Sequence, residues 1–84
     1  MEQKQKQKHS LTIVDFTITE HQTIFVQFSC YDAVLNKVVK GEVKFIGGVP
    51  YGDILHPDRS ILSMECREVV KEQLVTKYQS GEIS

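Results

Sequence analysis

Several residue types are scarce in this sequence of 84 residues, and each shortage limits what the chain can be. Tryptophan is absent, and there are only two cysteines and two prolines. Two cysteines are too few for the disulfide framework that stabilises many small secreted domains. Cys30 and Cys66 both lie in apolar segments, where a free thiol behaves as a small hydrophobic side chain. We therefore expect both to be buried, reduced thiols.

Long apolar runs and an excess of one charge are also missing. No run approaches the ~20 apolar residues that a membrane-spanning helix needs. Ten lysines and arginines against eleven acidic residues give a formal net charge of −1. That balance provides no general attraction to nucleic acids or to anionic membranes. We therefore expect no membrane partner.

The first ten residues are polar, and most of them alternate Gln and Lys. Such a composition predicts a disordered arm over residues 1–10. No apolar segment follows its lysines as it would in a secretory signal peptide, so we expect a cytoplasmic protein. Residues 11–81 are predicted to form a single domain, whose small size buries only about 60% of the surface of the unfolded chain.

Three segments alternate apolar and polar side chains with the period of two that indicates β-strands: residues 11–20, 23–32 and 38–46. The first loop should contain an odd number of residues, because a two-residue loop would put the apolar sides of the first two strands on opposite faces. The second loop should have a length that pairs Cys30 of the second strand with Val39 of the third. Asn36 is expected to be its residue in the left-handed conformation. The side chains predicted to form the buried face are Val14, Phe16, Ile18, Ile24, Val26, Phe28, Cys30, Val39, Val43 and Phe45.

The apolar period becomes helical from Ser60 to about Ser80. Asp58 or Ser60 is the expected N-cap, and Gly81 the expected stop. Residues 47–59, with three glycines and two prolines, are predicted to be irregular. The expected fold is α+β, a three-stranded antiparallel meander followed by one C-terminal helix packed on one sheet face. The stripe of the helix that faces the sheet is predicted to be Leu62, Cys66, Val69, Val70 and Leu74.

Motifs of catalytic and metal-binding chemistry are missing from the sequence. Its histidines are scattered, neither cysteine has a partner at ligand spacing, and there is no Gly-x-Ser-x-Gly motif. No metal site, no cofactor and no enzymatic activity is therefore predicted. One alternative stays open, because long loops in small domains often carry function. A small-ligand or catalytic site in the 47–59 loop would use Tyr51, Asp53 and His56.

The sheet face away from the helix is predicted to be open, because one helix covers only one face. Through this face we expect a small protein-interaction or regulatory domain to form a homodimer or to bind a protein partner. The alternative is single-stranded nucleic acid on the same face, with Phe25 and Tyr31 stacking on bases and Lys40 and Lys44 contacting phosphates. The apolar side chains predicted to form the interaction surface are Leu11, Ile13, Phe25, Tyr31 and Val38.

Overall fold

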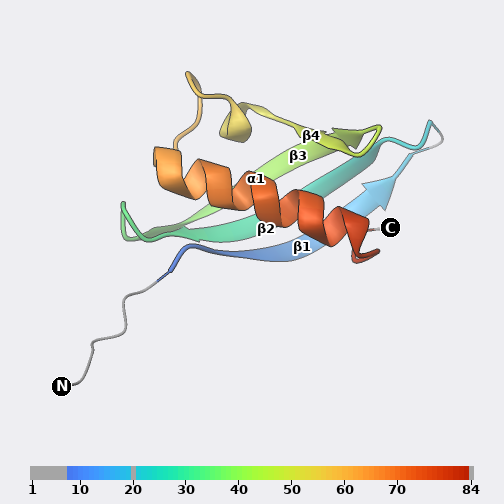
Figure 1. Cartoon of the computed structure of the whole chain (residues 1–84). Helices are drawn as coiled ribbons and strands as arrows, with labels where there is room; N and C mark the ends of the chain where they lie inside the picture. Colours follow the sequence, from blue (N-terminus) through green and yellow to red (C-terminus); the bar gives the residue numbers. More distant parts are fainter. Residues whose placement is uncertain (1–7, 20, 84) are drawn as a thin grey trace.

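An antiparallel sheet followed by one C-terminal helix makes up the fold (Figure 1), as seen in a computed structural model that describes residues 8–19 and 21–83. This arrangement confirms the predicted α+β fold, although the sheet has four strands rather than three. No helix in these ranges is long and apolar enough to cross a membrane. The elements in chain order are β1 (Ser10–Ile18), β2 (Ile24–Asp32), β3 (Lys37–Ile46), β4 (Val49–Tyr51), the 3-10 helix η1 (Asp53–Leu55) and α1 (Met64–Gln79).

The fourth strand lies in the segment that was predicted to be irregular. Gly47 and Gly48 both adopt positive φ angles, 61° and 83°, as a two-residue type I′ turn requires. The turn pairs Ile46 with Val49 and Lys44 with Tyr51. The prediction missed this hairpin because it treated the glycines only as breakers of regular structure.

The other two connections follow the predicted registers. Cys30 pairs with Val39, and Asn36 has a φ of 56°, so the β2–β3 hairpin is confirmed. Ile18 pairs with Ile24 and leaves residues 19–23 as a loop of odd length, which agrees with the parity argument. The predicted end of the first strand, residue 20, lies outside the described residues. The predicted arm falls mostly outside them too, but Ser10 already belongs to β1.

A β-bulge in β1 changes which of its side chains face α1. The register of β1 against β2 shifts between Ile13 and Asp15, so the alternation of side chains restarts after Val14. Leu11 is therefore buried opposite Cys30, and Ile13 packs against the core. Both residues were predicted to lie on the open face, and that prediction is wrong. The predicted burial of Val14 is also wrong, since its side chain is 63% exposed.

The remaining core agrees with the sequence pattern except near its edges. Ile18 shares the helix-facing side but is exposed, and Phe16 and Val69 are only partly buried. Ile83, just after the helix, is fully buried and was not predicted. The buried apolar side chains are Leu11, Ile24, Val26, Phe28, Cys30, Val39, Val43, Phe45, Leu62, Cys66, Val70, Leu74 and Ile83.

Helix α1 starts later than predicted and ends as predicted. Its N-cap is Ser63, whose hydroxyl oxygen accepts a hydrogen bond from the Cys66 N–H at 3.2 Å, so the predicted cap at Asp58 or Ser60 is wrong. At the other end Gly81 has a φ of 86°. The Glu82 N–H donates to the Lys77 carbonyl at 2.9 Å, which is the long hydrogen bond of a Schellman motif. This ending turns Ile83 back into the core.

Gly41 in β3 allows η1 to pack against the sheet. A Cβ atom at this position would lie 2.5 Å from Ile54 Cδ1 and 2.8 Å from Phe28 Cζ. The Phe28 ring therefore covers the glycine from β2, and Ile54 of η1 closes over both. Any side chain at position 41 would push these two groups apart.

We predict that Gly41→Ala lowers the free energy of unfolding by about 1–3 kcal/mol, the usual cost of overpacking a core. Urea titrations of Gly41→Ala, Ile54→Ala and the double variant against wild type measure it. Combining it with Ile54→Ala should cost less than the sum of the two single changes, because the nearest clashing group is gone. Additive losses would show that Ile54 does not close over Gly41.

Candidate functional site

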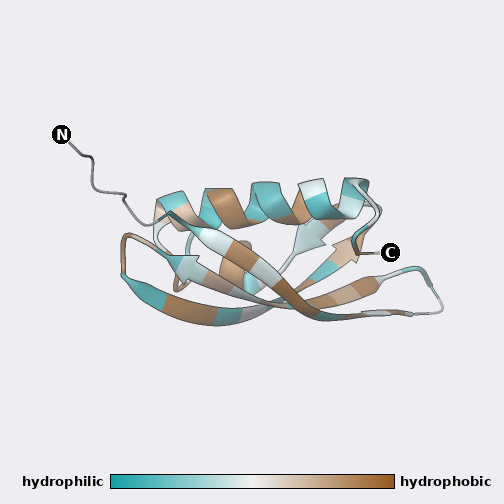
Figure 2. Ribbon diagram, turned by 90° about the horizontal axis from the view of Figure 1, so that it is seen from below, coloured by the Kyte–Doolittle hydropathy of each residue, from teal (hydrophilic) through white to brown (hydrophobic). Residues whose placement is uncertain are grey.

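The open face of the sheet is the side on which no described element packs. In Figure 2 α1 lies along one side of the sheet and the opposite side is uncovered. The paired registers order its side chains into rows that cross the strands. Tyr31 and Val38 form a row at one end, and Phe25, Lys44 and Tyr51 form a row toward the other.

The predicted interaction surface is divided by this arrangement. Phe25, Tyr31 and Val38 do lie on the open face, while Leu11 and Ile13 lie on the helix side. Six positions separate Phe25 from Tyr31 along β2, which is about 20 Å in a strand. The rows between them carry polar side chains, Thr12, Ser29 and Lys40 in one and Asp15, Gln27 and Glu42 in the other. The five predicted residues therefore do not form one patch.

A different apolar cluster occupies the end of the face beside the β3–β4 turn. Phe25 and Tyr51 flank Lys44 in one row, and Ile46 pairs with Val49 in the next. We call Phe25, Ile46, Val49 and Tyr51 the apolar corner; their exposed fractions are 39, 48, 45 and 52%. Val49 and Tyr51 join it only because β4 exists. Reading Gly47-Gly48 as a hairpin turn would have found them.

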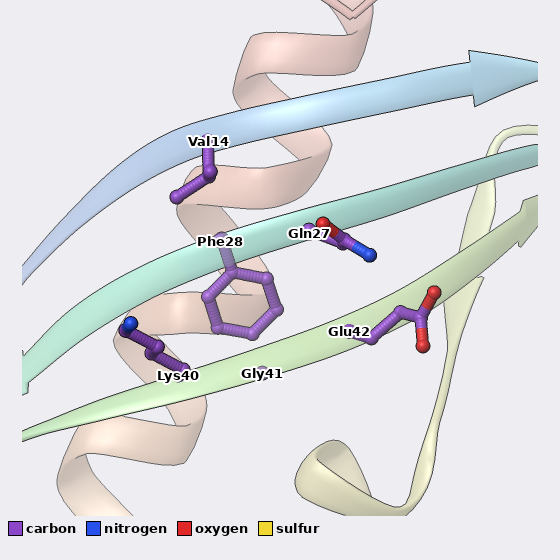
Figure 3. Close-up of a pocket in the computed structure, with 6 residues that line it drawn as sticks. All are labelled: Val14, Gln27, Phe28, Lys40, Gly41 and Glu42. Carbon is purple, nitrogen blue, oxygen red and sulfur yellow. The ribbon is translucent and has the colours of Figure 1, made fainter.

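The polar centre of the open face is hollowed. A depression of about 450 Å³ is bordered by Val14, Gln27, Lys40 and Glu42, with Phe28 and Gly41 also lining it. Figure 3 shows these residues on three neighbouring strands, with α1 behind the sheet. The polar side chains come from rows of mixed charge, so the hollow has no dominant sign. It separates the apolar corner from the Tyr31 end of the face.

The three candidate residues of the 47–59 loop border one hollow. Tyr51, Asp53 and His56 line a depression of about 390 Å³, and all three are exposed. Asp53 lies 3.6 Å from Arg59, and His56 Nδ1 accepts a hydrogen bond from the Asp58 N–H at 3.1 Å. The polar groups of Asp53 and His56 are thus engaged with loop neighbours rather than with each other.

Asp32, which the sequence did not single out, is a fully buried carboxylate at the end of β2. The N–H groups of Val34 and Leu35 donate to its Oδ1 at 3.0 and 3.1 Å. Ser63 donates its N–H to Oδ2 at 2.7 Å and its hydroxyl to Oδ1 at 2.8 Å. We call these contacts the Asp32 brace. They join the β2–β3 turn to the start of α1.

The brace also sets the ionisation of the carboxyl group. Burial on its own raises the pKa of Asp32, but the hydrogen bonds from Ser63, Leu35 and Val34 favour the charged form more strongly, so the pKa is lowered. The carboxylate also lies at the N-terminal end of α1, where the helix dipole favours a negative charge.

His9, Asp32 and Cys66 lie close enough to resemble a metal site. One ligand atom from each falls within 4.8 Å of the other two. However, His9 Nδ1 accepts a hydrogen bond from the Ala33 N–H at 3.0 Å, and the Cys66 thiol donates to the Tyr31 carbonyl at 3.7 Å. With Asp32 holding four donors of its own, the three groups support a hydrogen-bonded structural brace.

Both cysteines are free and buried on the covered side of the sheet. Burial, with the nearby charge of Asp32 and the neighbouring Cys30, raises the pKa of Cys66 to about 12. Burial also raises the pKa of Cys30, although a hydrogen bond with Cys66 acts in the opposite direction. Thiols in this state are poor nucleophiles and weak metal ligands.

Comparison of the chain with protein-family models, curated proteins and solved structures finds no match.

We predict that Asp32→Asn lowers the free energy of unfolding at pH 7 by on the order of 3 kcal/mol, because buried donors lose a charged acceptor. Since the folded pKa is lowered, the carboxylate stabilises the fold above the unfolded pKa near ~3.9, and this is lost as the pH falls through the folded pKa. The difference in free energy of unfolding between Asp32→Asn and wild type should therefore become smaller in acid. Urea titrations from neutral to acidic pH measure it. Asp53→Asn, at an exposed ion pair, is the control that should change little.

We also predict that neither thiol reacts with an aromatic disulfide reagent at pH 8 while the chain is folded. Thiolate is required for exchange, and Cys66 has a pKa of about 12. Absorbance should show both thiols reacting once urea unfolds the chain. Rapid reaction of the native protein would show that the cysteines are accessible.

Proposed function

We propose that this chain is a non-enzymatic protein-interaction domain that self-associates through the apolar corner of its open sheet face. The observation that carries this proposal is the clustering of four exposed apolar side chains, Phe25, Ile46, Val49 and Tyr51, in adjacent positions of neighbouring strands. Scattered apolar side chains are ordinary on a protein surface, but a contiguous cluster is typical of an interface.

Energy and symmetry support a second copy as the partner. Removing exposed apolar surface from water is favourable by roughly 25 cal/mol of free energy per Å². A domain of this size buries only a limited fraction of its surface within itself, so association can add to that burial. A two-fold axis lets one patch serve both copies and closes the assembly at a dimer.

The chemistry of the described residues supports a binding role over a catalytic one. The buried titratable groups Asp32 and Cys66 are engaged in the brace beneath the sheet. The exposed candidates Asp53 and His56 contact their own loop neighbours. The Cys66 thiol lies near His9, but its raised pKa and its hydrogen bond to the Tyr31 carbonyl do not favour a nucleophile activated by a base.

Single-stranded nucleic acid remains the second candidate because of one row of the face. Phe25 and Tyr51 present exposed rings on either side of Lys44, and aromatic stacking beside a cation is how many sheets hold unpaired bases. Asp15 and Glu42 on the same face weaken its attraction for phosphate. Tyr31 lies at the far end of the face, so this site would use Tyr51 in its place.

We predict that Phe25→Lys converts a dimer into a monomer without unfolding it, because it places a charge inside the corner at a partly exposed position. Light scattering over a range of concentrations measures the mass, and circular dichroism checks the fold. Val38→Lys is the matched control: it adds the same charge to the same face at a 64% exposed position outside the corner, and should leave the dimer intact.

A wild-type chain that stays monomeric at high micromolar concentration would contradict self-association. The nucleic-acid candidate replaces the proposal if that monomer binds a fluorescent oligo-dT at low salt and Phe25→Ala abolishes the binding. Phe25→Lys, which adds a positive charge, should then still bind. Phe25→Ala removes the stacking ring without changing the charge.

A further inference from the structure

One edge of β3 has no partner over more than half of the strand. The short strand β4 pairs only with Lys44, Phe45 and Ile46. Among the described residues, no strand pairs with the outer side of β3 from Lys37 to Val43. An unpaired strand edge is a template for another extended chain.

The direction of the backbone groups along this edge follows from the β3–β4 turn. In a two-residue hairpin the flanking residues, Ile46 and Val49, exchange both hydrogen bonds, so Ile46 and Lys44 direct their backbone groups toward β4. The register with β2 runs without a break from Phe45 back to Lys37. Lys40 and Val38 therefore direct their N–H and C=O groups outward, away from β2. We call residues 37–41 the free edge of β3.

A groove runs beside the free edge. It has a volume of about 400 Å³ and lies between residues 40–42 on the strand side and Asp53, Ile54, Arg59 and Ile61 on the loop side. Figure 3 shows η1 on the side of β3 that is away from β2. Ile61 is 62% exposed, so the groove offers an apolar wall to a side chain that enters it.

The groove carries two cations, Lys40 and Arg59, and two carboxylates, Glu42 and Asp53, so a charge preference for its occupant is local rather than general. Arg59 is paired with Asp53 at 3.6 Å. Among the described residues Lys40 has no ion-pair partner. An acidic side chain placed opposite Lys40 on an added strand would form a favourable cross-strand pair.

The other free edge of the sheet is less suited to the same role. No strand of the described residues pairs with the outer side of β1, but its bulge between Ile13 and Asp15 interrupts the spacing of its backbone groups. Bulges are one of the devices by which proteins protect an edge from further pairing. No such interruption occurs in the register of β3.

We propose that the free edge of β3 binds an extended segment of a partner protein as an added strand, with apolar side chains facing the groove and an acidic side chain opposite Lys40. This mode of recognition takes its affinity from the main chain and its selectivity from alternate side chains. It uses a different surface from the apolar corner, so it goes beyond the self-association proposed above.

The test uses two blocked peptides, Ser-Thr-Val-Glu-Val-Thr-Ser and the same peptide with Lys in place of Glu. Each sequence reads the same in both directions, so the result does not depend on strand orientation. Proton–nitrogen NMR of the full chain follows amide shifts and hydrogen exchange. We expect the Glu peptide, at millimolar concentration, to slow exchange of the Val38 and Lys40 amides. The Lys peptide should bind about fivefold more weakly, because like charges directly opposite one another across two strands are destabilising.

Matched variants of the chain separate the free edge from the rest of β3. Lys40→Glu should reverse the preference between the two peptides. Lys44→Glu makes the same change on the same strand, but where β4 already pairs, and should preserve the preference. Lys40→Pro removes the outward N–H without removing a hydrogen bond to β2, and should abolish protection. If Lys40→Pro fails to fold, the two charge reversals still decide the result.

Three results would overturn the proposal. One is the absence of any change at the Val38 and Lys40 amides with either peptide. Another is equal binding of both peptides that Lys40→Glu leaves unchanged. The third is protection that falls on β1 or on the apolar corner instead. Phe25→Lys should leave peptide binding intact, because Phe25 lies in the apolar corner. Peptide binding at the free edge is therefore tested independently of self-association.

Discussion

The buried carboxylate of Asp32 is the contact on which the arrangement of this fold most depends. A charge removed from water is tolerated only when its hydrogen-bonding capacity is filled, and here four donors from two distant parts of the chain fill it. Two come from the β2–β3 turn and two from Ser63, which is also the N-cap of α1. The same group therefore closes a hairpin and fixes where the helix begins. From that anchor α1 packs across the apolar face of β2 and β3, the same face on which Asp32 is buried.

The covered face is completed by two local departures from regular strand structure. The bulge in β1 returns Leu11 and Ile13 to the side of the core. Gly41 leaves room for the Phe28 ring and for Ile54, so η1 can pack on the middle of β3 beside α1. Both features bring apolar side chains under cover in a domain with little core. The bulge also removes Leu11 and Ile13 from the open face, to which the simple alternation assigns them.

Strand β4 shapes both surfaces proposed to bind partners, one by its presence and the other by its short length. Its residues Val49 and Tyr51 complete the apolar corner beside Phe25 and Ile46. It then ends after pairing with only Lys44–Ile46, which leaves the outer edge of β3 unpaired over residues 37–41. The corner offers apolar side chains, and the edge offers backbone hydrogen-bonding groups beside a groove. These are different kinds of recognition, and the polar centre of the sheet keeps them apart.

The sequence by itself determined the local features of this protein. Period-two and helical patterns gave the three long strands, the helix, the pairing of Cys30 with Val39, the left-handed Asn36 and the stop at Gly81, because each depends on neighbours in the chain or on one strand partner. Strand β4 was also within reach, since Gly47-Gly48 is a recognised turn signal. The bulge at Val14, the cap at Ser63 and the buried role of Asp32 were decided by tertiary structure. Nothing near Asp32 in the sequence marks it, because half of its donors come from a serine 31 positions away. A charged residue is buried only where the fold brings distant donors to it.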